Sequence, residues 1–235
     1  MSALASFGLA LALLCAAHAS AHAQTAIGLG ATLFFDSGTL ENDERIGPLH
    51  DVTRDDITNP RLAAGALSFL YALGDGTPRD GFRLGGEFRY MGGYAVERGD
   101  GNGNDNRTDL GTLMELGFRG EWSTELLPRF GLSFGLRADL GILVPGGDFA
   151  DEIDRLADEG VPTGQGPRVG LSLIPMVGAR YELHERVHVR LDLGLGWTMI
   201  DLFGIDDTVQ GIAYTRDETV SATRFEVTIG FELSL

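Results

Sequence analysis

Cysteine is almost absent from this chain, and so are long apolar runs. The single cysteine, Cys15, lies within the first 23 residues. If that segment is removed, the mature chain has no disulfide and no cysteine ligand for a metal. Beyond the segment, no stretch approaches the roughly 18 consecutive apolar residues that a membrane-spanning helix requires. Helical membrane spans are therefore excluded, and a bilayer would have to be crossed with strands.

Basic residues are also scarce. The chain has 18 Lys and Arg against 34 Asp and Glu, which leaves a formal net charge of −16. Binding to phosphate backbones requires the opposite sign, so nucleic acid is not expected as a partner. Only 8 prolines accompany 34 glycines. That balance suits a closed sheet better than a disordered chain.

Residues 1–23 form an apolar segment that bears on the compartment. Its centre is leucine-rich, and it ends in Ala21-His22-Ala23, with small residues at the minus-three and minus-one positions. This pattern predicts a secretory signal peptide cleaved before Gln24, although the segment contains no Lys or Arg. A buried helix or a membrane anchor is the alternative. The predicted organisation is a signal peptide over 1–23 and one β-domain over 24–235.

Eight later stretches alternate apolar residues with polar residues or glycine. Alternation with a period of two over about ten residues is typical of a membrane-spanning strand. The predicted strands are Ala26–Asp36, Leu62–Leu73, Phe82–Gly92, Thr112–Trp122, Phe130–Val144, Val169–Leu183, Val187–Ile200 and Val220–Leu235.

Alternation alone leaves open which face points outward, because a soluble lipocalin-type barrel would hold its apolar residues inside. Two features of the faces favour apolar residues outside. The apolar face carries more large side chains than an eight-stranded interior can hold, and the other face mixes Gly and Ser with paired charges. Aromatic residues also gather at both ends of the strands, as at the two interfaces of a bilayer. They are Tyr71, Phe82, Trp122, Phe130 and Tyr181 beside short links, and Phe35, Tyr90 and Trp197 beside long ones.

The links between the predicted strands alternate in length. The short links are Gly74–Gly81, Ser123–Arg129 and His184–Arg186, and the long links are Ser37–Arg61, Gly93–Gly111, Pro145–Arg168 and Leu202–Thr219. If the chain starts in the periplasm, every short link lies there and every long link lies outside, as in bacterial barrels. The predicted fold class is all-β: an eight-stranded antiparallel up-and-down transmembrane β-barrel with short periplasmic turns and long extracellular loops.

In these features the chain resembles the eight-stranded outer-membrane β-barrel proteins of the OmpA and OmpX transmembrane-domain type. The end of the chain also resembles the signal read by the barrel assembly machinery, here Thr228, Gly230, Leu233 and Leu235, although many family members end in an aromatic residue. The resemblance implies the cell outer membrane of a Gram-negative bacterium as the location. It implies outer-membrane lipid, lipopolysaccharide and the assembly machinery as partners. It assigns no functional subfamily.

The inward face of the predicted barrel is rich in charges of both signs. Because an isolated ion in a narrow lumen costs on the order of several kcal/mol, these residues are expected to pair across strands. The favoured hypothesis is a salt-bridged plug. A narrow porin-like channel with a charged constriction is the alternative, and acid–base catalysis by paired carboxylates is a third. The predicted lumen residues are Glu87, Arg89, Glu115, Arg119, Arg137, Asp139, Arg190, Asp192, Arg224 and Glu226.

Barrel enzymes of similar size, which transfer or remove acyl chains, use a His with Ser or Asp. Only His50, His184 and His188 follow residue 23, and the serines near the outer rim are Ser37 and Ser221. No convincing Ser–His pair can be assembled from them, so the sequence predicts no enzyme, no catalytic residue and no cofactor. The predicted role is structural or surface-interacting, with a lipid-modifying enzyme as the least favoured hypothesis and any extracellular ligand unidentified.

The long links carry most of the excess acid. Asp148–Gly160 predicts a short amphipathic helix over the barrel mouth, capped by Asp148 and ended by Gly160. Its predicted apolar stripe is Phe149, Ile153, Leu156 and Ala157. Asp100, Asn102 and Asn104 are a weak calcium candidate, because oxygen side chains at alternate positions are typical of the start of a calcium loop. A flexible glycine-asparagine turn is the favoured interpretation, and no other metal site is predicted.

Overall fold

The computed structural model describes residues 25–59, 62–73, 80–99 and 105–235. The predicted signal peptide lies outside the described residues. Within those ranges, no helix is long and apolar enough to cross a membrane.

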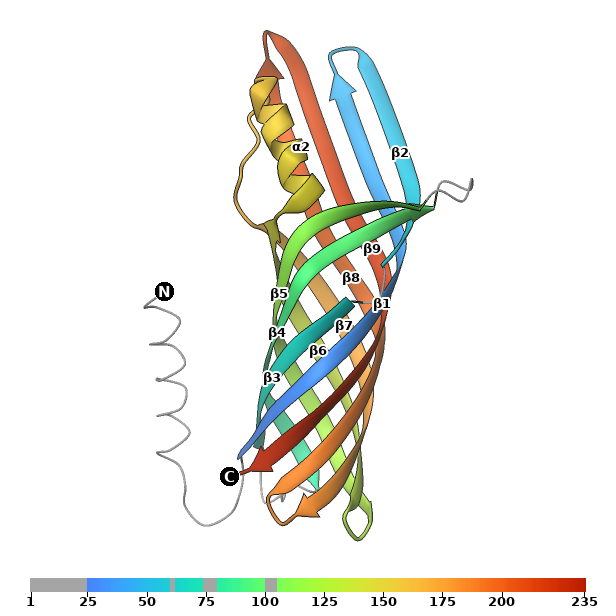
Figure 1. Ribbon diagram of the computed structural model, residues 1–235, viewed down its shortest axis with the longest axis vertical. Helices are drawn as coiled ribbons and strands as arrows, with labels where there is room; N and C mark the ends of the chain where they lie inside the picture. Colours follow the sequence, from blue (N-terminus) through green and yellow to red (C-terminus); the bar gives the residue numbers. More distant parts are fainter. Residues whose placement is uncertain (1–24, 60–61, 74–79, 100–104) are drawn as a thin grey trace.

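The described chain is built of antiparallel strands with one helix (Figure 1). Except for β2 and β3, strands that are consecutive in the chain hydrogen-bond to each other, which makes the topology up-and-down. In chain order the elements are β1 (Thr25–Ile46), β2 (Leu49–Thr58), β3 (Leu62–Ala72), β4 (Gly81–Gly99), β5 (Asp105–Leu127), β6 (Phe130–Pro145), α2 (Gly147–Asp158), β7 (Arg168–His184), β8 (Val187–Val209) and β9 (Ile212–Ser234).

The sheet closes on itself through β1 and β9. Their register runs from Ala26 opposite Ser234 to Ile46 opposite Tyr214. On its other edge, β1 pairs with β3 along its first half and with β2 along its second half. The strands β2 and β3 therefore share one position in the ring, and the ring has eight positions. The predicted eight-stranded antiparallel barrel is confirmed.

The two ends of the barrel differ in length. At one end, here the turn end, β5 and β6 are joined through Pro128 and Arg129, and β7 and β8 through Glu185 and Arg186. At the other end, the hairpin end, the strands continue far beyond the barrel wall (Figure 1). All four long links were predicted as loops, and for the described residues of three of them this is wrong. Most of 37–61, 93–111 and 202–219 is strand, because alternation continues in a more polar form and paired backbone groups extend the hairpins.

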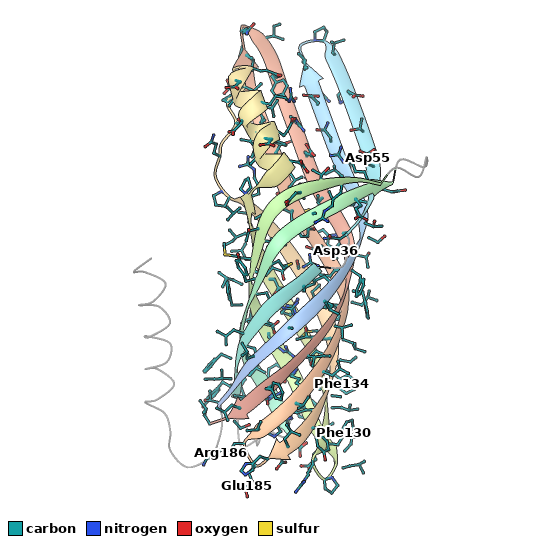
Figure 2. All side chains as sticks on the ribbon, in the orientation of Figure 1. Asp36, Asp55, Phe130, Phe134, Glu185 and Arg186 are labelled. Carbon is teal, nitrogen blue, oxygen red and sulfur yellow. The ribbon has the colours of Figure 1, made fainter. Side chains whose placement is uncertain are left out.

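The exterior of the barrel wall is apolar (Figure 2). Leu136 and Leu193 are 47% and 40% exposed, whereas their chain neighbours Arg137 and Asp192 are 0% and 3% exposed. The predicted aromatic rims also point outward, with Trp122 at the turn end 56% exposed. The apolar face therefore points away from the lumen, and the lipocalin-type alternative is wrong.

The helix α2 lies against the hairpin end, and its apolar stripe is confirmed in part. Phe149, Ile153 and Leu156 are buried, but Ala157 is exposed. The predicted cap is wrong: Gly146 occupies the N-cap position without a side-chain bond, and Asp148 instead accepts a hydrogen bond from the backbone N–H of Asp109 at 2.8 Å. Gly160 follows the helix with a φ of 84°, a left-handed conformation that favours glycine.

Candidate functional site: the barrel interior

The lumen is filled with ionised side chains from the turn end to about mid-height. Seven arginines and eight carboxylates are buried there. All ten predicted lumen residues are among them, namely Glu87, Arg89, Glu115, Arg119, Arg137, Asp139, Arg190, Asp192, Arg224 and Glu226. The structure adds Asp36, Arg83, Glu121, Arg180 and Glu232. The prediction missed these five although each continues the inward parity of its strand, which is the signal that identifies them.

An arginine and a carboxylate two positions apart recur on several strands. Because side chains alternate between the faces of a strand, residues i and i+2 point into the lumen together. Arg137 Nε donates to both carboxylate oxygens of Asp139 at 2.8 Å. Arg190 Nε donates in the same way to Asp192, at 2.7 and 2.8 Å. Each strand thus brings a locally compensated pair.

Bonds across the lumen join these pairs at mid-height. Arg137 donates to the two oxygens of Glu226 at 2.8 and 2.9 Å. Arg89 Nη1 donates to Glu226 at 2.7 Å, and Arg119 Nη2 donates to Asp192 at 2.9 Å. Glu226 therefore lies between two arginines that come from the far side of the barrel. Such charge-assisted bonds hold opposite walls together.

The network continues toward the turn end. Glu121 accepts hydrogen bonds from Arg83, Arg119 and Arg190. Glu232 accepts from Arg83 at 2.8 Å and from Arg190 at 3.1 Å. Since each carboxylate faces more than one guanidinium, the desolvation cost of burying these ions is offset locally.

Toward the hairpin end, the network ends at Arg224, beside two aromatic rings. Arg224 donates to the two oxygens of Asp36 at 2.8 and 2.9 Å and also bonds Glu115. Its guanidinium lies 4.8 Å from the centre of the Phe34 ring. The hydroxyl of Tyr94 donates to Asp36 at 3.4 Å. Phe34 and Tyr94 thus cover the last ions with apolar surface.

Inward-facing glycines provide space for the carboxylates. Gly117 lies opposite Asp139 on the next strand, and Gly178 lies opposite Asp192. A Cβ at Gly117 would lie 2.1 Å from Asp139 Oδ1, and one at Gly178 would lie 2.2 Å from Asp192 Oδ1. Any larger residue at these positions would displace an ion from its partner. The high glycine content therefore has a direct use in the lumen.

Little space remains between the charges. A cavity of about 30 Å³ lies beside Gly28, Gly30, Ala66 and Ser68, where small side chains face the lumen. A buried water requires roughly 10–15 Å³ by this measure, so the cavity holds about two waters. This part of the lumen is a packed charged layer.

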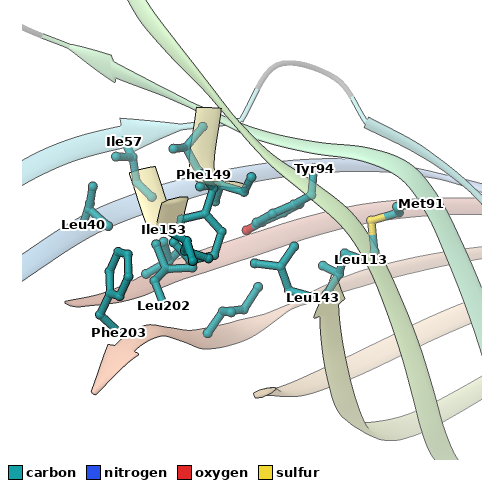
Figure 3. Close-up of a cluster of buried hydrophobic side chains, with 14 of the residues drawn as sticks. Leu40, Ile57, Met91, Tyr94, Leu113, Leu143, Phe149, Ile153, Leu202 and Phe203 are labelled. Carbon is teal, nitrogen blue, oxygen red and sulfur yellow. The ribbon is translucent and has the colours of Figure 1, made fainter. Parts of the chain in front are cut away.

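Above the charged layer, the interior is apolar (Figure 3). The strands and α2 bury a cluster in which Met91, Tyr94, Leu113 and Leu143 are each at most 1% exposed. Phe149 of α2 packs edge-on against Phe203, with ring centres 5.2 Å apart. No apolar layer was predicted. Met91, Leu113 and Leu143 lie at the ends of predicted strands, whereas Leu202 and Phe203 come from a β-extension that was predicted as a loop. The barrel is thus filled by ions in one layer and by hydrocarbon in the next.

The other predicted site residues lie as follows. Thr228 shares a 2.7 Å hydrogen bond with Thr32, and Gly230 lies opposite Gly30 on β1. Leu233 and Leu235 are 43% and 45% exposed. The calcium candidates Asp100, Asn102 and Asn104 lie outside the described residues. In the part of the chain that is described, no group of three or more His, Cys, Asp or Glu side chains is arranged to hold a metal ion.

Solved structures of outer-membrane barrels are similar to this chain in fold. No family model and no curated protein sequence matches the chain. The crystal structure of the outer membrane protein OprG from Pseudomonas aeruginosa is similar, with a TM-score of 0.54, 13% identity, and coverage of 91% of this chain and 98% of OprG. Neisserial surface protein A aligns with a TM-score of 0.43 and 12% identity, over 89% of this chain and 99% of that protein. The outer membrane protease OmpT from Escherichia coli aligns with a TM-score of 0.37 and 10% identity, over 88% and 97%.

At these identities a likeness shows the fold alone, and among the three only the OprG alignment is close enough to support it. The chain has the architecture of an outer-membrane β-barrel. It resembles the eight-stranded type in strand number, connectivity and orientation of its faces.

Proposed function

We propose that this protein is an integral outer-membrane barrel with a structural or surface-interaction role, and that its lumen does not conduct solutes. The observation that carries the proposal is the double filling of the interior. Buried ion pairs such as Arg137–Glu226 occupy the lower and middle lumen, and the apolar cluster around Leu113 and Leu143 lies above them. A passing ion would have to displace first one layer and then the other.

The same proposal includes location and orientation. The exposed apolar wall supports insertion in lipid, and the unequal ends support short turns in the periplasm with long hairpins outside. The signal peptide over 1–23, lipopolysaccharide as a neighbour and delivery by the barrel assembly machinery belong to the proposal as well. The exposed Leu233 and Leu235 support the last of these, because their side chains point away from the lumen.

Planar-bilayer recording tests the closed lumen. The purified barrel should give no steady single-channel steps, whereas a narrow pore should give steps of constant size. A Gly178→Ala variant is the comparison, because disturbing the Asp192 pair should produce at most unsteady leakage. Steady steps from the wild-type protein, abolished by substitution of Arg137 and Asp139, would establish the porin-like alternative.

We also propose that the barrel is not an enzyme. His50 accepts or donates a 2.9 Å hydrogen bond with Asp43 near the hairpin tip, and it lies opposite Arg45, eight residues along β1 from Ser37. At about 3.3 Å per residue, His50 and Ser37 are too far apart to act together. Ser221 accepts a hydrogen bond from Trp197 at 2.9 Å. Mass spectrometry of lipid A from cells with and without the protein tests this, and a changed acylation pattern would establish an enzyme.

A further inference from the structure

One edge of β2 is unpaired. The opposite edge of this strand pairs with β1 along its whole length. The unpaired edge meets β4 only at Ile57 and Thr58, so among the described residues no strand lies beside residues 49–56 there. We call the edge along residues 49–56 the free edge, and Figure 1 shows it on the outer side of the hairpin that β1 and β2 form above the barrel. An exposed strand edge is a ready template for pairing with another chain.

The free edge carries backbone groups that are available for hydrogen bonds. Just beyond β2, the Asn59 N–H donates to the Asp36 carbonyl oxygen of β1 at 2.9 Å. Bonding alternates along an antiparallel strand, and the register of β1 with β2 has no shift. Odd-numbered residues of β2 therefore bond to β1, whereas His50, Val52 and Arg54 direct their N–H and C=O groups toward the free edge. All of these residues are exposed, so a partner strand can reach them.

The strands behind the free edge hold it in place. On its far side β1 pairs with β9 as far as Ile46 opposite Tyr214. The N–H of Gly47, in the turn between β1 and β2, donates to the carbonyl oxygen of Ala213 at 2.8 Å, which joins the tips of two hairpins. An edge that is already ordered lowers the entropic cost of binding a partner.

The side chains beside the free edge are mostly acidic. Residues 37–58 carry six carboxylates and two arginines, a formal charge of −4. Odd-numbered residues of β2 face the mouth of the barrel, as the buried Ile57 does, so Asp51 and Asp55 point the same way. The single arginine of β2, Arg54, lies on the opposite face. The face toward the mouth therefore favours a cationic partner.

The short contact with β4 shows which side chain this face accepts. Arg98 of β4 lies opposite Ile57, and its Nε is 3.9 Å from Asp55 Oδ2. Farther along the free edge, Asp51 lies opposite Glu44 of β1, which adds another carboxylate to the same face. A strand placed along the free edge would meet these acids with its own alternate side chains.

A second copy of this chain fits the free edge poorly. Facing residues of an antiparallel pair lie on the same face of the sheet, so two copies of β2 would bring both Asp51 and both Asp55 side chains together. Like charges in such positions destabilise a sheet. An incoming strand of opposite charge avoids this repulsion. It also gains apolar contacts with Leu49 and Val52, which are 71% and 52% exposed on the two faces.

We propose that the free edge of β2 binds an extended, cationic polypeptide segment by strand addition. The segment runs antiparallel to β2, as β4 does, and its backbone pairs with His50, Val52 and Arg54. Its lysine or arginine side chains, at alternate positions, face Asp51 and Asp55. This inference rests on the proposed surface-interaction role and names the class of partner.

Amide NMR on the complete mature barrel in nanodiscs of zwitterionic lipid tests the free edge. The probe is the peptide acetyl-Thr-Lys-Val-Lys-Thr-Leu-amide, whose lysines would lie opposite Thr53 and Asp51. We expect saturable shifts and slower hydrogen exchange of the His50, Val52 and Arg54 amides, with a dissociation constant on the order of 1 mM for so short a peptide.

Two modified peptides separate strand addition from simple charge attraction. The N–H groups of the peptide's valine and second threonine would face β2, so N-methylation of those two residues should abolish binding. N-methylation of the two lysines, whose N–H groups would face away, should leave most of the binding intact. Replacing both lysines by glutamate should abolish it, because the added carboxylates would face Asp51 and Asp55.

Substitutions in the barrel test the same contacts. Val52→Pro removes an N–H of the free edge without removing a bond between β1 and β2, and it should weaken peptide binding about ten-fold. Asp51→Asn together with Asp55→Asn should weaken it about five-fold. Asp217→Asn is the matched control, because it removes an exposed carboxylate of β9 away from the free edge and should bind as wild type. A gel shift between unheated and boiled samples verifies folding of each variant.

Three results would overturn the proposal. They are unchanged affinity in Val52→Pro, equal binding of the glutamate peptide, and protection of the free-edge amides that rises with protein concentration in the absence of peptide. The last would identify a second copy as the partner. Planar-bilayer recording measures the closed lumen separately, so a failure of peptide binding and a failure of the proposed function are distinguishable.

Discussion

Removing Arg137 is the sharpest perturbation of the charged layer. This side chain is 0% exposed and supplies hydrogen bonds to Asp139 and Glu226. In Arg137→Met the apolar stem survives, but among the described side chains no other hydrogen-bond donor to Asp139 remains. Glu226 still accepts from Arg89. Leaving one buried carboxylate uncompensated should lower the free energy of unfolding by about 3–5 kcal/mol.

Urea unfolding of the barrel from lipid vesicles measures this free energy, with the fluorescence of Trp122 and Trp197 as the signal. Adding Asp139→Asn to Arg137→Met removes the unpaired charge and should recover at least about 1 kcal/mol relative to the sum of the single effects. Arg54→Met, on the exposed face of β2, should change the free energy by no more than about 0.5 kcal/mol. A loss below 1 kcal/mol in Arg137→Met, or strict additivity with Asp139→Asn, would refute the interpretation of the layer as a coupled network.

Three further predictions concern other levels of the barrel. Gly178→Ala places a Cβ 2.2 Å from Asp192 Oδ1 and 2.5 Å from Ser133 Oγ. It should therefore lower the free energy of unfolding in urea by about 1–3 kcal/mol, and an unchanged midpoint would contradict this. Phe149→Ala removes an anchor of α2, and hydrogen exchange should show faster exchange in α2 amides while the strands keep their protection; equal protection in both proteins would count against the packing described. Hydrogen bonds from Arg155 and Arg216 lower the pKa of Glu152 from its ordinary value of 4.5. The ion pairs therefore stabilise α2 fully at a pH above 4.5. Their contribution is lost as the pH falls through the lowered pKa. Exchange in α2 should accelerate in that acidic range and should not do so in Glu152→Gln, where a persisting pH effect would assign it to another group.

The alternation of apolar and polar residues predicted the barrel well. Because the period of a strand is two, knowing that Leu136 faces outward assigns Arg137 to the lumen without any tertiary information. All ten charged residues predicted for the lumen are buried there. The partners across the lumen were not predictable, since Arg137 and Glu226 are 89 positions apart and only the closure of the ring brings them together.

The hairpin end was predicted less well, for a physical reason. Strand extensions such as Ser37–Ile46 carry Glu, Asp and Arg on their outer face, and polar residues of this kind are equally common in loops. Pairing of β1 with β2 and β9 satisfies their backbone groups, so the segment is a strand despite its composition. Part of the apolar layer was missed for the same reason, because Leu40 and Phe203 have an inward direction only if their segments are strands.

Local order along the chain decides which side of the wall each residue occupies, because a strand has only two faces. Closure of the ring and the height at which each strand stops decide which residues meet. In this protein, ring closure and strand length place an ionic layer toward the turn end and an apolar layer toward the hairpin end. Only the tertiary structure decides this, because strands far apart in the sequence come into contact only once the ring has formed.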